Sequence, residues 1–167
     1  QLYLWAVLLR ILLQLVRADF YHPVAQFVWA VTRLPLQPLQ PLIPKYRRLD
    51  VAASLLLLVI AAIYVLIIGE LLSVRLSTLD VLRISLLKIM VTTLNLYTLC
   101  LFAQAVLSWL GPGVNNPAGS ILWSLNEPLL RPVRRWLPPM AGLDLAPLAV
   151  ILALQFFNML LPIGPFR

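Results

Sequence analysis

Four long apolar stretches, at residues 2–16, 51–72, 84–110 and 145–162, dominate the pattern of hydrophobic and polar positions along the chain. A helix needs about 20 mostly apolar residues to cross the hydrocarbon core of a bilayer. The last three stretches meet that requirement, and the third is long enough to tilt. The first is shorter, and because the chain begins at Gln1 rather than Met, we interpret it as the second part of a span. The pattern predicts an all-α membrane protein with four transmembrane helices.

The segments between the paired spans contain helix-start signals and prolines. Segments 23–33 and 117–126 each begin with a proline, which suits the first turn of a helix. Trp29 and Trp123 suit headgroup depth, so each segment is predicted to be a short interfacial helix. The prolines that follow lack the N–H that a helix needs, so we expect each helix to end there in a Pro-rich loop.

The two halves of the chain repeat each other at a shift of 94 positions, without a gap. The shift pairs Leu13 with Leu107, Pro23 with Pro117, Trp29 with Trp123, Leu36 with Leu130, Pro38 with Pro132, Pro44 with Pro138, Asp50 with Asp144 and Leu58 with Leu152. A register that persists through helix, loop and helix is typical of an internal duplication. We therefore divide the chain into repeat one at 1–72, a short linker at 73–83 and repeat two at 84–167. Asp50 and Asp144 then occupy equivalent N-cap positions before the second and fourth spans.

Two spans in each repeat make both repeats enter the membrane in the same direction. The expected arrangement is a pair of tandem helical hairpins related by a pseudo-two-fold axis along the membrane normal. It differs from the inverted repeats of many transporters. Both Pro-rich loops then lie on one side of the membrane, and the linker lies on the other side with both termini.

Composition supports the membrane interpretation and limits the meaning of the positive charge. Hydrophobic residues make up 62% of the chain, charged residues 11%, and the mean hydropathy is +0.93. A soluble domain has about a quarter charged residues, so this chain has too few to cover a water-facing surface. The net charge of +7 comes from cations at the ends of apolar runs, which suit anionic lipid headgroups and topology control rather than nucleic acid.

The distribution of the cations predicts the orientation. The loop side contains more of them, namely Arg17, Arg33, Lys45, Arg47, Arg48, Arg131, Arg134 and Arg135, and the opposite side contains Arg75, Arg83, Lys88 and Arg167. The positive-inside rule therefore places the Pro-rich loops in the cytoplasm and the termini in the periplasm, in a bacterial inner membrane.

Polar side chains inside the predicted spans are candidates for function. Arg10 and Gln14 lie four residues apart on one face of the first span, and the shift of 94 places Gln104 and Ser108 on the equivalent face of the third. We expect Arg10 and Gln104 to approach each other near the pseudo-two-fold axis. The favoured interpretation is hydrogen bonding between helices. The alternative is the lining of an ion or proton path.

Further polar positions lie nearer the opposite boundary and on the last span. Glu70 and Lys88 fall at similar depths, where they either form an ion pair that joins the repeats or extend separately to the headgroups. Asn95, Gln155 and Asn158 are expected to face another helix rather than lipid.

The sequence offers little for catalysis. His22 is the only histidine, and the only cysteine, Cys100, lies in an apolar run and excludes an internal disulfide framework. The carboxylates are scattered, and no His, Cys or acidic residues are grouped at the spacing of a metal site. We predict that the protein is not an enzyme and has no cofactor.

The loop of repeat two, PLLRPVRRWLP followed by GLD, and the segment LLRILLQLVRADFYHPVAQFV of repeat one resemble the YggT (also called YlmG) family of small bacterial and plastid membrane proteins. The resemblance covers nearly the whole chain. It draws attention to the loop residues Pro38, Pro44, Arg47, Arg48, Asp50, Arg131, Pro132, Arg134, Arg135, Trp136, Pro138 and Asp144. Repeat one departs from the pattern, because Gln37, Gln40 and Pro41 stand where repeat two has Arg131, Arg134 and Arg135.

The resemblance implies contacts with other membrane proteins as the main function. Plastid relatives look like biogenesis factors for a cytochrome complex, and bacterial relatives are associated with cell-division gene neighbourhoods. We therefore expect a scaffold or assembly factor bound to another membrane protein complex, with self-association as a further possibility. One alternative is a component of an ion channel or transporter, since relatives are linked to osmotic and potassium tolerance. A second is an anionic-lipid-binding protein that uses the arginines beside Trp136, which otherwise serve as a topology anchor.

Overall fold

The computed structural model describes residues 1–16, 23–37, 50–109, 117–137 and 144–166, without the side chains of 108, 109, 117 and 118. The loop residues Pro38, Pro44, Arg47, Arg48 and Pro138 lie outside the described residues, and so does the side chain of Ser108. The described chain is all helical, with no strand. Its elements are α1 (Leu2–Val16), α2 (Pro23–Leu36), α3 (Val51–Leu71), α4 (Thr78–Trp109), α5 (Pro117–Trp136), α6 (Ala146–Leu160) and the 3₁₀ helix η1 (Gly164–Phe166).

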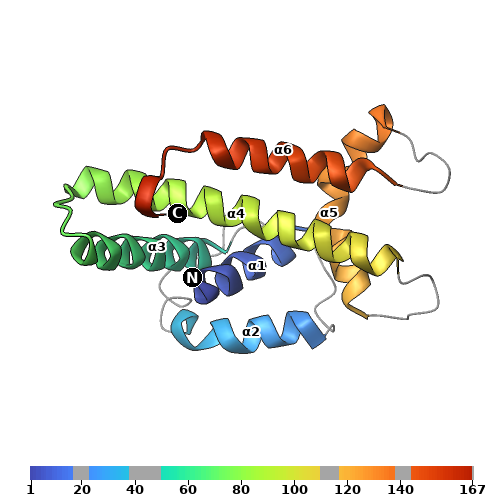
Figure 1. The fold of residues 1–167 in the computed structure, drawn as a ribbon. Coiled ribbons are helices and arrows are strands. Elements are labelled where there is room, and N and C mark those ends of the chain that lie inside the picture. Colours follow the sequence, from blue (N-terminus) through green and yellow to red (C-terminus); the bar gives the residue numbers. More distant parts are fainter. Residues whose placement is uncertain (17–22, 38–49, 110–116, 138–143, 167) are drawn as a thin grey trace.

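The long helices lie side by side, with α4 at the centre (Figure 1). Helices α1 and α4 run in one direction, and α3 and α6 run in the other. Helix α2 lies along α1, whereas α5 crosses the end of α4 that lies away from the α3–α4 turn. The equivalent connector helices of the two repeats, α2 and α5, therefore lie differently. After α6 the chain folds back, so that η1 lies against α4 near the α3–α4 turn.

Two helices in the described part of the chain, Val51–Leu71 and Thr78–Leu107, are long and apolar enough to cross a membrane. Helices α1 and α6 are apolar but shorter, at 15 residues each. The core is formed by small and branched side chains where helices meet, such as Val7 and Ala53 between α1 and α3 and Leu101 and Leu130 between α4 and α5. Many large apolar side chains of α3, α4 and α6 remain exposed.

The turn between α3 and α4 is shorter than the predicted linker. Helix α4 begins at Thr78 rather than near Ile84, because Ser77 and Asp80 form a reciprocal capping box. The Ser77 hydroxyl accepts from the Asp80 N–H at 3.2 Å, and the Asp80 carboxylate accepts from the Ser77 N–H at 3.1 Å. At the end of α3, Ser73 adopts a positive φ of 55°.

Helix α5 corrects the prediction for the second connector. It continues through Pro128 and Pro132 as one helix of 20 residues, whereas the prolines were expected to end it near residue 126. Each proline removes one backbone hydrogen bond. The helix persists because its buried stripe, which includes Ile121, Leu125 and Leu130, packs against the core on both sides of Pro128. Helix α2 likewise extends past residue 33 to Leu36 and contains Pro35.

Candidate functional site

The most enclosed charge in the described structure is Arg10 of α1, whose side chain is 1% exposed. Its Nη1 donates to the Thr32 hydroxyl at 2.9 Å, and its guanidinium lies 4.1 Å from the centre of the Trp29 ring. Its Nη2 lies 3.7 Å from the Asp50 carboxylate. Arg10 therefore joins α1 to α2 and to the start of α3.

Asp50 has two tasks at this position. One carboxylate oxygen accepts from the Ala53 N–H at 3.2 Å and so caps α3, as predicted, while the other faces Arg10. Asp50 is 4% exposed, so each charge compensates the other in a site with little water. The Arg10 Nε lacks a hydrogen-bond partner among the described residues.

In repeat two, the residues equivalent to Arg10 and Thr32 are also joined by a side-chain hydrogen bond. Gln104 and Asn126 stand 94 positions after Arg10 and Thr32, and the Asn126 amide donates to the Gln104 side-chain oxygen at 2.7 Å. Asn126 is fully buried, as Thr32 is. In each repeat this bond joins a long helix to the connector helix that follows it.

The arginine of repeat two comes from a different helix. Arg134 of α5 lies 5.0 Å from the centre of the Trp123 ring, and Trp123 is the equivalent of Trp29. Its Nη2 lies 2.8 Å from the Asp144 carboxylate, and its Nη1 lies 3.0 Å from Glu127. Both repeats therefore place an arginine between a connector tryptophan and the aspartate before the next helix.

The sequence difference between the repeats now has a physical meaning. Where repeat one has Arg10 and Gln40, repeat two has Gln104 and Arg134. Each repeat has one arginine and one glutamine at these two positions, in opposite order. A single cation is enough to pair with the aspartate in each repeat, and a second buried cation would lack a partner.

The expected approach of Arg10 to Gln104 is not formed. Each bonds within its own repeat, to a residue 22 positions later. Gln14 is half-buried on α1 and makes no hydrogen bond with a described residue. The partners Thr32 and Asn126 were missed, although the shift of 94 pairs them.

The polar residues of the last helix bond to α4, and the prediction is confirmed for Asn158, which is buried, while Gln155 remains exposed. Asn158 donates to the Asn95 side-chain oxygen, and Gln155 donates to the Thr98 hydroxyl at 3.2 Å. These bonds add polar contacts to the apolar packing of α4 against α6.

Lys88 and Glu70 do not form the predicted ion pair. The Lys88 ammonium, 2% exposed, donates to the Phe166 carbonyl at 3.0 Å and lies 4.3 Å from the Tyr64 ring centre. It thereby attaches η1 to α3 and α4. Glu70 is exposed at the end of α3 and forms no ion pair with a described residue.

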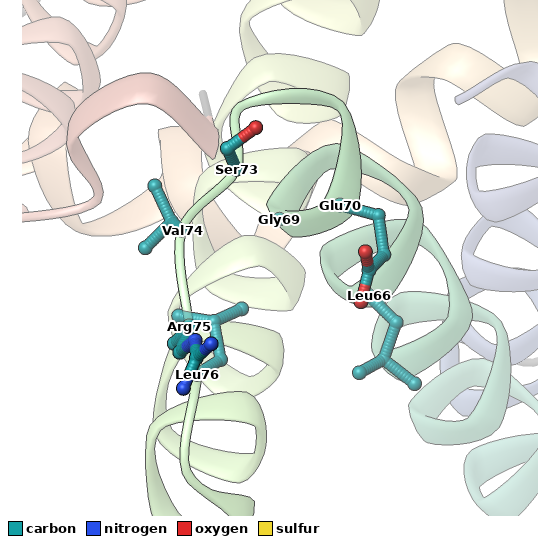
Figure 2. A pocket seen from close by; sticks show the side chains of 7 residues that line it. All are labelled: Leu66, Gly69, Glu70, Ser73, Val74, Arg75 and Leu76. Atoms are coloured by element: carbon teal, nitrogen blue, oxygen red, sulfur yellow. The ribbon is translucent and has the colours of Figure 1, made fainter.

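A pocket of about 510 Å³ lies at the α3–α4 turn (Figure 2). Leu66 and Glu70 line it from α3, and Arg75 and Leu76 line it from the chain segment that follows the turn. One carboxylate and one guanidinium among apolar groups do not select a ligand of either charge. No group of three or more His, Cys, Asp or Glu able to hold a metal occurs in the described part of the chain.

The arginines of α5 fall into two environments. Arg134 is enclosed by Glu127, Asp144 and the Trp123 ring. Arg131 and Arg135 are exposed, as are Pro132 and Trp136. The predicted N-cap position of Asp144 is wrong by one residue, because Leu145 is the N-cap of α6 and makes no side-chain capping bond. The Asp144 carboxylate, one residue earlier, still accepts from the Ala146 N–H at 3.0 Å and also from Arg134.

These features define an all-helical protein with long apolar helices and a polar cluster that occurs once in each half of the chain. The model of the CCB3/YggT family matches residues 1–71 and 84–165, in agreement with two tandem repeats. The chain belongs to this family.

Curated relatives cover most of the chain. A Pseudomonas aeruginosa protein is 37% identical over 95% of this chain and 82% of its own length. A Vibrio alginolyticus protein, named for the proC 3′ region, is 37% identical over 98% of this chain and 90% of its own length. Escherichia coli YggT is 34% identical over 95% of this chain and 82% of its own length. None of these names states an activity, and no solved structure gives a significant match.

Proposed function

We propose that the protein is a multi-pass membrane scaffold that assembles with other membrane proteins. The membrane part of the proposal rests on the exposed apolar surface. Only 28% of the most apolar 18-residue stretch of Val51–Leu71 is buried, and only 33% of that of Thr78–Leu107. The core helix of a soluble protein is mostly buried. Leu55, Ile63 and Ile67 of α3 and Phe156 and Met159 of α6 are among the exposed side chains. Lipid tails are the natural surroundings for them.

In this proposal α1, α3, α4 and α6 are the four membrane helices. The shared direction of α1 and α4, and of α3 and α6, supports two hairpins that enter from the same side. At about 1.5 Å per residue, the 15 residues of α6 are about 22 Å long, which a bilayer accommodates by thinning locally. The α5 end of the bundle, with three arginines, is assigned to the cytoplasmic side of a bacterial inner membrane, and the α3–α4 turn to the periplasmic side.

The observation that carries the scaffold proposal is the closed pairing of the polar groups inside the bundle. Arg10 bonds to Thr32 and Asp50, Gln104 bonds to Asn126, and Asn95 bonds to Asn158. Hydroxyls along α4 also donate to their own helix: those of Ser85, Thr92, Thr93 and Thr98 each bond to the carbonyl four residues earlier. Groups that satisfy one another hold helices in place, and in the part of the chain that the structure describes few buried side-chain atoms remain unpaired to line an ion path.

The direct test is the composition of the native complex. The full chain, tagged at its own chromosomal locus, would be extracted in a mild detergent and examined by native mass spectrometry and cryo-electron microscopy. The scaffold proposal predicts a larger complex with a membrane protein at fixed stoichiometry. Recovery of the chain only alone or as a homo-oligomer would overturn it.

A channel or transporter component is the second candidate. It is favoured by three buried polar atoms, Tyr3 Oη, Arg10 Nε and Asn126 Oδ1, that lack a hydrogen-bond partner among the described residues. It predicts ion flux from purified protein in liposomes, with a changed ion selectivity in Arg10→Gln or Gln104→Ala. The absence of flux under every gradient and voltage applied would eliminate this candidate.

A further inference from the structure

The outward face of α5 presents two arginines that form no ion pair with another described residue. Arg131 and Arg135 lie four residues apart, so their side chains are neighbours on one face of the helix. Both are exposed, and neither forms an ion pair with a described residue. The adjacent Trp136 is 87% exposed. We call Arg131 and Arg135 the α5 outer face; Trp136, one residue after Arg135, ends the same helix about 100° further around its axis.

The nearby carboxylates are already occupied. Glu127 and Asp144 both pair with Arg134, at 3.0 and 2.8 Å. Arg134 also lies over the Trp123 ring, so three groups fix its position. The structure therefore separates one structural arginine from two arginines that are available to an external anion.

The opposite side of the helix fixes the direction in which the outer face points. Leu125 and Leu130 are 1% and 0% exposed and pack into the bundle. Because both leucines belong to the core, α5 cannot turn its arginines inward without losing that packing. The α5 outer face is therefore held toward the surroundings of the bundle.

The backbone of α5 indicates the depth at which this face lies. Pro128 and Pro132 lack N–H groups, so the carbonyls of Ser124 and Pro128 lose their helical partners. Such carbonyls are costly in hydrocarbon and are satisfied in the hydrated headgroup region. Exposed tryptophan favours the same depth. A guanidinium presents a planar pair of donors that matches the oxygens of a phosphate.

We propose that the α5 outer face binds the phosphate of an anionic phospholipid headgroup. Arg131 and Arg135 donate to the phosphate oxygens, and Trp136 lies at the boundary between headgroups and acyl chains. This inference rests on the proposed membrane location and adds the class of lipid that the protein selects.

The test uses the full chain in nanodiscs of phosphatidylcholine with a graded fraction of phosphatidylglycerol. Native mass spectrometry after release into detergent counts the phosphatidylglycerol molecules that stay bound. Each basic residue near an anionic surface adds about 1 kcal/mol, so we expect about fivefold weaker retention for Arg131→Gln or Arg135→Gln and about 25-fold for both. The matched control is Arg75→Gln with Arg83→Gln, which removes two exposed arginines near the opposite end of α4 and should lower retention much less than the loss of Arg131 and Arg135.

The outcomes separate this inference from the membrane proposal. Equal phosphatidylglycerol retention by the two double variants would overturn the inference while leaving the membrane location intact. Millimolar inorganic phosphate that displaces the lipid would point to a free-phosphate site and would also overturn it. An acidic protein retained through these arginines in place of the lipid is a third contradicting result. Failure of the unmodified chain to enter nanodiscs would instead contradict the proposed function. The single substitutions give the same comparison if the double variant does not fold.

Discussion

At the scale of single residues, Arg10 and Arg134, the arginines of the two polar clusters, differ in how much their removal should destabilise the protein. Arg10 is 1% exposed and has partners on α2 and at the start of α3, whereas the side chain of Arg134 is 23% exposed. Removing one partner of a buried ion pair leaves the other charge uncompensated and costs about 3 to 5 kcal/mol. A partly exposed pair costs less, because water screens the remaining charges.

Arg10→Gln is therefore expected to lower the free energy of unfolding by about 3 kcal/mol or more, because it leaves Asp50 buried beside a neutral group. Arg10→Lys keeps the charge but loses the planar guanidinium that lies 4.1 Å from the Trp29 ring centre, so its effect should be intermediate. Arg134→Gln should cost about 1 to 2 kcal/mol. Reversible unfolding in mixed micelles, followed by tryptophan fluorescence, measures all three. A stability of Arg10→Gln equal to that of the unmodified chain would contradict the importance of this ion pair.

At the scale of elements, the α3–α4 turn has the geometry of a Schellman motif. The Val74 N–H bonds to the Gly69 carbonyl at 2.9 Å, and the Ser73 N–H bonds to the Glu70 carbonyl at 3.0 Å. Ser73 adopts the left-handed conformation (φ 55°) that is normally given to glycine in this motif. A side chain in that conformation costs roughly 1 kcal/mol.

Ser73→Gly should consequently stabilise the protein by up to about 1 kcal/mol, because glycine adopts the left-handed region without that cost. Gly69→Ala is the matched control. Its added Cβ would lie 2.8 Å from the Leu76 Cδ1, the mobile end of that side chain, and alanine favours the helical conformation of residue 69, so the two effects oppose each other and the net change should be small. The midpoint of thermal unfolding measures both. A lower midpoint for Ser73→Gly than for the unmodified chain would show that the Ser73 side chain has a stabilising contact that outweighs the strain.

The same elements explain which parts of the fold were predictable from sequence. Apolar runs located α1, α3, α4 and α6, and Asp50 marked the start of α3 correctly, because these signals act within one turn of helix. The Ser77 and Asp80 spacing was also a readable start signal, and it was overlooked. The continuation of α5 past Pro128 was not predictable locally, since packing of Leu130 against α4 and α6 opposes the loss of hydrogen bonds.

At the scale of the whole molecule, the sequence identified most residues of the polar clusters but not which residues contact each other. Arg10, Gln104, Asp50 and Asp144 were all singled out, but Arg10 and Gln104 were expected to meet across the repeats. The sequence shift correctly equates positions in the two halves, yet it gives no distance between them. Each connector helix supplies a nearer partner, so each polar cluster closes within its own repeat.

Each polar cluster supplies one arginine that pairs with the aspartate before the next helix. If the two arrangements are equivalent, the residues of repeat one should also stabilise repeat two. Arg134→Gln alone leaves Asp144 without its guanidinium, and adding Gln104→Arg and Asn126→Thr restores one cation and the hydroxyl found in repeat one. We expect the triple variant to be more stable than Arg134→Gln by about 1 kcal/mol, a coupling between sites that additive effects would not produce. Gln104→Arg with Asn126→Thr in the otherwise unmodified chain should destabilise, because Asp144 already has Arg134 and a second cation would be buried without compensation. Unfolding of the four proteins under one set of conditions measures the coupling. The contradicting result is a change in the unfolding free energy of the triple variant equal to the sum of the changes for its component variants. It would show that the two halves, although equivalent in sequence, no longer share interchangeable clusters.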